Sequence, residues 1–174
     1  MAVLLLCILS AGQTPADQHP PIELKIKGAY LLNFTRLVTW PNSSYRSAND
    51  PTVIGILGDT RLVEILEDAL ATRQPPSRRV VVLTIESLEQ IPQCHLLFVS
   101  RKAETPLGEI LEQASGFPIL TVSDIEKFTT RGGAIWLFLD NDRIGMDINR
   151  VSEHHAQLQI SSRLLRLARN VLEK

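Results

Sequence analysis

Short apolar runs alternate with stretches of helical character along most of this chain. Turn-forming residues bound four of these runs, which predicts buried strands at residues 53–57, 80–85, 96–99 and 118–122. The helix expected after Asp59 or Thr60 has a clear apolar stripe, made of Leu62, Val63, Leu66 and Leu70. Strands that alternate with helices favour a mainly parallel, doubly wound α/β sheet flanked by helices on both faces.

The pattern changes after Gly133. Two extended runs, 134–139 and 143–148, are joined by Asp140-Asn141-Asp142, which predicts an antiparallel hairpin near the C-terminal side. The second run alternates apolar and polar residues, as at the edge of a sheet. Further helices are expected at 22–40, 105–114, 150–156 and 162–172, the last with Ser161 as its cap.

The first residues indicate export. Residues 2–9 are all apolar and are followed by small and turn-forming residues, a run too short to span a bilayer but typical of a secretory signal. We therefore predict a signal peptide at 1–16 and a single α/β domain at 22–174, a length suited to one hydrophobic core. Cleavage would leave Cys94 as the only cysteine, expected to be buried in an apolar strand and unreactive.

Composition and spacing argue against several functions. The net charge is −1, so no overall positive field would attract nucleic acid. His154 and His155 are adjacent and would point in different directions on a helix, and the chain has no CxxC, HxH or HExxH spacing. A GxSxG elbow and a glycine-rich phosphate loop are also missing. We therefore expect no catalytic residues, no cofactor and no metal site.

Two regions carry candidate partner-binding residues. Arg163 and Arg166 recur with Arg169 at three-residue spacing on the expected last helix, either as a solvated polar face or as a docking strip for an acidic partner. Arg143 and Asp147 lie on the expected edge hairpin. The sequence therefore predicts Arg143, Asp147, Arg163 and Arg166 as partner contacts.

A different kind of site is suggested at the ends of the strands. Asp59, Ser100 and Asp124 each follow a predicted strand, where open α/β sheets bind ligands. The acids can equally serve as helix caps. Asn33 is a polar residue on the otherwise apolar face of the first expected helix. If it is buried there, its side chain needs hydrogen-bond partners.

Six segments occur in a characteristic order. They are KGAYLLNFTRLVTWP at 27–41, VIGILGD at 53–59, CHLLFVS at 94–100, LTVSD at 120–124, IGMDIN at 144–149 and ISSRLLRLA at 160–168. This ordered set resembles the YfiR family, small periplasmic proteins that regulate cyclic-di-GMP signalling, and the resemblance covers roughly residues 22–172.

The resemblance implies an α/β fold and a non-enzymatic periplasmic protein that acts by binding. Its partner would be the periplasmic domain of an inner-membrane diguanylate cyclase, which it would repress, or of a sensor kinase. It also implies a homodimer, and neither nucleic acid nor membrane insertion after signal cleavage is expected. Many relatives carry disulfides, but Cys94 has no second cysteine to pair with in the mature chain. The alternative is a periplasmic small-molecule-binding protein that serves a sensor kinase or transporter.

Overall fold

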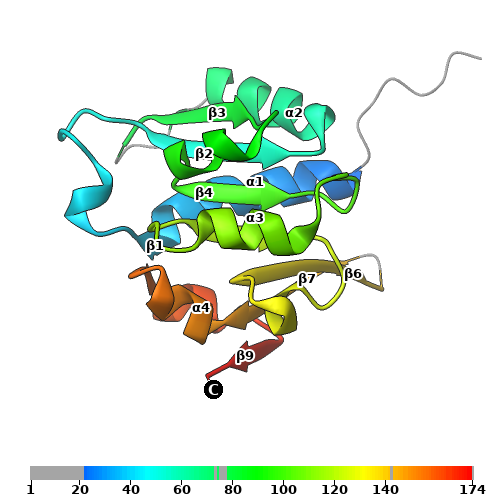
Figure 1. The fold of residues 1–174 in the computed structure, drawn as a ribbon. Coiled ribbons are helices and arrows are strands. Elements are labelled where there is room, and N and C mark those ends of the chain that lie inside the picture. The colour runs from blue at the N-terminus through cyan, green and yellow to red at the C-terminus, as the bar shows by residue number, and fades with distance from the viewer. Residues whose placement is uncertain (1–21, 73, 75–77, 142, 174) are drawn as a thin grey trace, which may run out of the picture.

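A seven-stranded sheet forms the centre of the molecule (Figure 1). The computed structural model describes residues 22–72, 74, 78–141 and 143–173. The strand order is β3 (Val80–Thr84), β2 (Thr52–Leu57), β4 (Leu96–Val99), β5 (Leu120–Ser123), β6 (Ile135–Asp140), β7 (Arg143–Asn149) and β9 (Asn170–Leu172). Strands β3 to β6 are parallel, β7 is antiparallel to β6, and β9 is parallel to β7. The predicted α/β class, with its antiparallel hairpin near the C-terminal side, is confirmed.

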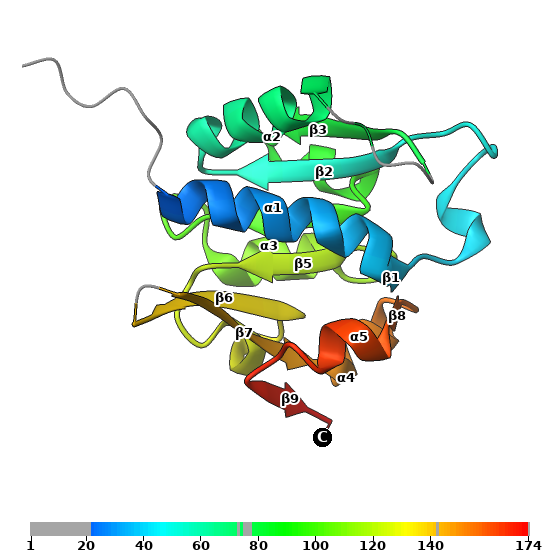
Figure 2. The ribbon, with the colours of Figure 1, turned by 180° about the vertical axis from the view of Figure 1, so that it is seen from behind.

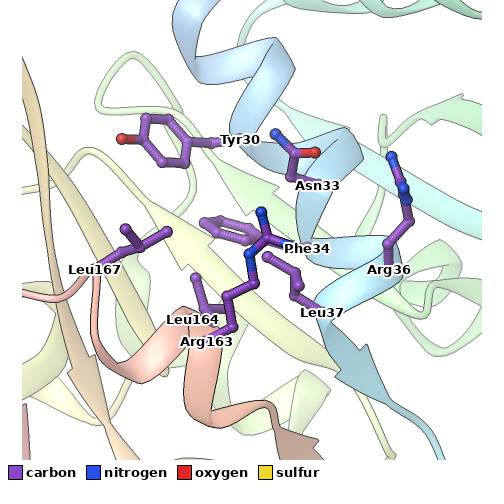
Figure 3. Close-up of a pocket in the computed structure, with 8 residues that line it drawn as sticks. All are labelled: Tyr30, Asn33, Phe34, Arg36, Leu37, Arg163, Leu164 and Leu167. Atoms are coloured by element: carbon purple, nitrogen blue, oxygen red, sulfur yellow. The ribbon is translucent and has the colours of Figure 1, made fainter.

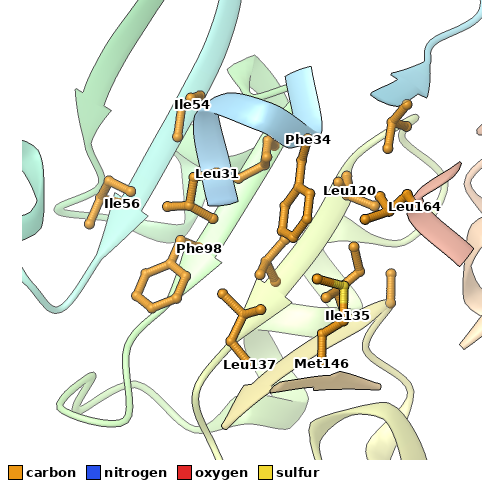
Figure 4. Packing of buried hydrophobic residues seen from close by; sticks show 14 of the residues in the cluster. Leu31, Phe34, Ile54, Ile56, Phe98, Leu120, Ile135, Leu137, Met146 and Leu164 are labelled. Carbon is orange, nitrogen blue, oxygen red and sulfur yellow. The ribbon is translucent and has the colours of Figure 1, made fainter. Parts of the chain in front are cut away.

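Helices cover both faces of the sheet. Helices α1 (Ile22–Leu37) and α2 (Thr60–Thr72) pack on one face, and α3 (Leu107–Ala114) and the 3-10 helix η2 (Leu88–Gln93) pack on the other (Figures 1 and 2). Strand β4 shows why both faces are apolar: Leu96 and Phe98 point into the larger core, while Leu97 and Val99 point into the smaller one. Figure 4 shows the larger core, where Leu31 and Phe34 of α1 pack on the strands.

The remaining elements are short. They are β1 (Val38–Thr39), η1 (Asn42–Ser44), η3 (Phe128–Arg131), α4 (Arg150–His155), β8 (Gln159–Ile160) and α5 (Ser162–Leu165). The stripe predicted for α2 is confirmed, since Leu62, Val63, Leu66 and Leu70 are all buried. Strands β2 to β7 lie within a few residues of their predicted positions.

The first helix ends three residues earlier than predicted. Helix α1 stops at Leu37, and Val38 and Thr39 form β1, which pairs antiparallel with Ile160 and Gln159 of β8. Trp40 then donates its indole N–H to the carbonyl oxygen of His95 at 2.9 Å. The helical spacing of the sequence continues to Trp40, but backbone pairing with a segment 120 residues away overrides it.

The predicted helix at 162–172 is wrong beyond its first turn. Ser161 does cap α5, because its hydroxyl oxygen accepts the backbone N–H of Leu164 at 3.3 Å. The chain then leaves the helix, and residues 170–172 pair with β7 as β9. As a result β7 is not a sheet edge, which corrects the prediction made from its alternating pattern, and Asp147 is only 6% exposed.

The predicted signal peptide lies outside the described residues. Among those that the structure describes, no helix is both long and apolar enough to cross a membrane. Cys94 is buried as predicted, and this burial raises the pKa of its thiol to about 12, which keeps it protonated and unreactive at neutral pH.

Candidate functional site

A groove of about 360 Å³ runs between α1 and α5 (Figure 3). Its lining comes from two segments that are far apart in the sequence but adjacent in space: Tyr30, Asn33, Phe34, Arg36, Leu37, Arg163, Leu164 and Leu167. A volume of this size is within the range of sites that bind small molecules or a few side chains of a protein partner.

Helix α1 supplies one wall and the floor. Asn33 and Phe34 are each three or four residues from both Tyr30 and Leu37, so the four residues lie on one side of the helix. The Phe34 ring is completely buried and lies 5.9 Å from the Tyr30 ring, centroid to centroid. The Tyr30 hydroxyl points toward β7, where its oxygen is 3.4 Å from the carbonyl oxygen of Ile144. The floor is therefore firmly attached to the larger core.

Helix α5 supplies the opposite wall, and the β1–β8 pair positions it. The N–H of Ser161 donates to the carbonyl oxygen of Leu37 at 2.9 Å, which joins the start of α5 directly to the end of α1. Leu164 is buried between the two helices, whereas Leu167 is 59% exposed beside the groove. The groove is thus apolar at its base and has an exposed leucine at its margin.

The rim is positively charged. Arg36 and Arg163 are both exposed, and none of the described residues that line the groove is acidic. Neither arginine forms an ion pair with any residue in the described part of the chain. Figure 3 shows Arg163 extending from α5 toward α1. Two guanidinium groups and the Asn33 amide above an apolar floor suit a carboxylate or phosphate carried on an apolar group.

The lining offers little for catalysis. It contains no carboxylate, imidazole or thiol that could act as a general base or nucleophile. These side chains suit recognition through apolar contact and positive charge.

Of the four predicted partner-binding residues, only Arg163 lines this groove. Arg166 follows α5 and is exposed outside the lining, and Arg143 is exposed at the hairpin, opposite Asp140 in the strand register. Their role as partner contacts stays a prediction.

Asp147 is held inside the protein instead of at an exposed edge. Its carboxylate accepts hydrogen bonds from the Arg169 guanidinium at 3.3 Å and from the Asn170 side-chain amide at 3.2 Å. The Arg169 guanidinium also lies 3.9 Å from the centre of the Phe138 ring. The structure therefore assigns Asp147 to fastening β9, and Arg169 does not continue an arginine face with Arg163 and Arg166.

Sequence reasoning missed Tyr30, Arg36 and Leu167. Arg36 follows Asn33 by three residues, so the helical spacing could have placed the two on adjoining parts of α1. Asn33 itself is exposed at the groove instead of buried. Nothing in the sequence indicates that this face of α1 lies against Leu164 and Leu167.

At the strand ends, the proposed ligand-binding groups are already paired with other side chains. Asp59 accepts from Lys102 at 2.9 Å, and Ser100 is 1% exposed. Asp124 accepts from Lys27 at 2.7 Å and from the Arg101 backbone N–H at 2.6 Å. Among the described residues, neither carboxylate accepts an N–H of the helix that follows it, so these pairings favour a structural role for this edge through ion pairs and a loop hydrogen bond, instead of a ligand crevice or helix caps.

Comparisons with known proteins bear on both the fold and the family. A conserved domain protein from Vibrio cholerae O1 biovar eltor str. N16961 is similar in structure, with a TM-score of 0.57 and 10% sequence identity over 85% of this chain and 60% of that chain. The ABC domain in complex with L-Trp from Streptococcus pneumonia has a TM-score of 0.51 and 10% identity over 81% of this chain and 59% of that chain. This chain thus spans about 60% of the length of each, and the likeness concerns the fold alone.

No curated protein matches the chain in sequence. A family model does match, over residues 24–169, and it describes YfiR/HmsC-like proteins. This range includes both walls of the α1–α5 groove and the five adjacent parallel strands β2 to β6. The chain belongs to the YfiR/HmsC-like family.

Proposed function

We propose that this protein is a non-enzymatic periplasmic regulator that binds the periplasmic domain of an inner-membrane diguanylate cyclase and represses it. The observation that carries the proposal is the family match over 24–169. Membership of this family supports a regulatory role in cyclic-di-GMP signalling. It also supports a protein that regulates instead of catalysing a reaction. The apolar run at residues 2–9 supports export to the periplasm.

Repression would act through a difference in affinity. A binding protein shifts a two-state enzyme only by as much as it prefers one state over the other. Moving a cyclase from almost fully active to almost fully inactive requires roughly ten-thousand-fold tighter binding to the inactive state. A broad protein contact can supply such a preference, and the protein is proposed to act as a homodimer.

The alternative function, a small-molecule-binding protein, has less support at the strand ends, where the sequence suggested its ligand site. Asp59 and Asp124 are already paired with Lys102 and Lys27. A ligand there would have to replace ion pairs that the fold already contains.

The test is the cyclic-di-GMP content of the native host after deletion of the gene, measured by mass spectrometry. We expect a rise that is reversed by a full-length copy, but not by a copy that lacks residues 1–16 and stays in the cytoplasm. An unchanged or lower cyclic-di-GMP level after deletion would contradict repression. Full rescue by the copy without residues 1–16 would contradict a periplasmic site of action.

A further inference from the structure

We infer that the α1–α5 groove docks an acidic, apolar segment of a protein partner. The inference deepens the proposed function, and rests on it only in taking that partner to be the periplasmic domain of a diguanylate cyclase. The segment would place an apolar side chain against Leu37, Leu164 and Leu167 and a carboxylate between the two arginines of the rim.

No residue in the described part of the chain covers the apolar part of the groove. Leu167 is 59% exposed, while Phe34 and Leu164 beneath it are almost completely buried. An exposed leucine next to an apolar floor gains from a partner that removes it from water. The contact would therefore be centred on Leu167, with the polar groups around it.

The charge of the rim selects the partner. Arg36 and Arg163 contribute two positive charges to a lining whose described residues include no acid, although the whole chain carries a net charge of −1. This positive character is local, so it favours a carboxylate at this position instead of general attraction to anions. Arginine is well suited to the role because its planar guanidinium can donate two parallel hydrogen bonds to one carboxylate.

Charge also argues against the two other occupants within reach. A second copy docked symmetrically through this groove would bring its own Arg36 and Arg163 against the same arginines. The segment before Ile22 has one carboxylate, Asp17, and residues 10–21 around it include no leucine, isoleucine, valine or phenylalanine. That segment therefore does not place a large apolar side chain next to a carboxylate.

The first experiment measures binding of the protein to the purified periplasmic domains of the host's membrane diguanylate cyclases, by isothermal titration calorimetry. The groove variant R36E/R163E is compared with R61E/R79E, which changes the net charge equally at two exposed arginines outside the groove. We expect at least a tenfold loss of affinity for R36E/R163E, a smaller but clear loss for L167D, and little change for R61E/R79E.

A second probe does not depend on the cyclase. The peptide acetyl-Leu-Asp-Phe-Glu-Leu-amide and its neutral counterpart, acetyl-Leu-Asn-Phe-Gln-Leu-amide, are titrated into methyl-labelled protein. We expect the acidic peptide to shift the methyl resonances of Leu37, Leu164 and Leu167, and the neutral peptide or R36E/R163E to show little effect. Higher salt should weaken the shifts, since the rim is exposed.

The outcomes separate this inference from the proposed function. Equal cyclase binding by R36E/R163E and R61E/R79E would overturn the groove as the docking site and leave repression intact. If no cyclase domain binds but the acidic peptide selectively shifts the groove methyls, the inference stands and the choice of partner is wrong. Equal shifts with both peptides, or none with either, would overturn the requirement for an acidic segment. If the acidic peptide shifts the groove methyls only after residues 1–21 have been removed, the groove is instead occupied by the chain's own N-terminal segment.

Discussion

Lys27 is the most deeply buried charged residue of α1. It is 1% exposed, and its ammonium group contacts the carboxylates of Glu23 and Asp124, the latter at 2.7 Å. Arg101 contacts the same two carboxylates. This four-residue cluster connects the start of α1 to the end of β5 and to the loop after β4. A buried cation is tolerated here because two carboxylates surround it.

Replacing Lys27 by methionine should destabilise the protein by about 3 kcal/mol, because it leaves the buried Asp124 carboxylate without its closest cation. The free energy of unfolding from urea titration measures the effect. The matched control is K25M, at an exposed lysine two residues earlier on α1, which should change stability by less than about 0.5 kcal/mol. If K27M and the unmodified protein have equal free energies of unfolding, Lys27 contributes no net stability through this cluster.

His95 is a buried imidazole whose neutral form is required by its neighbours. Its Nδ1 accepts the backbone N–H of Val53 at 3.1 Å, and its Nε2 lies 3.1 Å from the carbonyl oxygen of Ser44, to which it must donate. The ring stacks on Tyr45 with 4.5 Å between the ring centres, and the Arg78 guanidinium lies 3.8 Å from the centre of the Tyr45 ring.

Burial is the main cause that lowers the pKa of His95 below its ordinary value of 6.5, and the positive charge of Arg78 lowers it further. The Ser44 carbonyl and the charge of Asp50 act in the opposite direction. The Ser47 hydroxyl lowers the pKa of Asp50 below its usual 3.8, which favours the charged form of that carboxyl.

Because the unfolded chain takes up a proton at His95 before the folded protein does, stability should be complete above pH 6.5 and decline as the pH falls below it. The variant H95N keeps an acceptor for the Val53 N–H but does not titrate, so its urea midpoint should fall less between pH 7.5 and 5.5. H155N, at an exposed histidine, should keep the original slope. If the urea midpoints of H95N and the unmodified protein fall equally with pH, His95 is not the source of the pH dependence.

Among the secondary elements, the two-residue strands β1 and β8 matter most for the groove. They hold α5 beside the end of α1, and a buried side chain supports them. Glu153 of α4 is 2% exposed, and its carboxylate accepts the backbone N–H of Ile160 in β8 at 2.6 Å. Arg150 lies 3.4 Å from the other carboxylate oxygen.

The variant E153L should therefore destabilise the protein by about 2–3 kcal/mol, since it leaves a buried N–H without an acceptor. It should also speed hydrogen exchange of the Ser161 amide, which joins β8 to Leu37. E153Q keeps a carbonyl oxygen and should show a smaller loss. If exchange at Ser161 is unchanged in E153L, Glu153 does not position the α5 wall of the groove.

At the scale of the whole molecule, one continuous sheet with a core on each face predicts a single cooperative unit. A chain that begins at Ile22 should unfold in one transition, with equal calorimetric and van't Hoff enthalpies of about 100 kcal/mol near 60 °C. Two separate heat-absorption peaks would contradict the prediction of one domain at 22–174.

The sequence by itself determined the parallel part of this protein. Each strand from β2 to β5 is a short apolar run between turn residues, and α2 has its apolar stripe at helical spacing. These signals are local, because the backbone of each element sets the period at which its side chains return to the same face. A few consecutive residues therefore show whether one or both faces of an element are apolar. The order of six motifs was likewise sufficient to suggest the family that the family model confirms.

Only the tertiary structure decided the ends of the chain and the candidate site. Residues 38–39 and 170–172 continue helical patterns in the sequence, yet they pair as strands because partners at β8 and β7 satisfy their backbone groups. The same pairings bury Asp147 and bring Leu167 and Arg163 beside Asn33 and Arg36. The β1–β8 pair and the groove join residues more than 100 positions apart, and β9 reaches β7 from 23 positions away. The free energy of these contacts depends on the completed fold and leaves no periodicity in either segment.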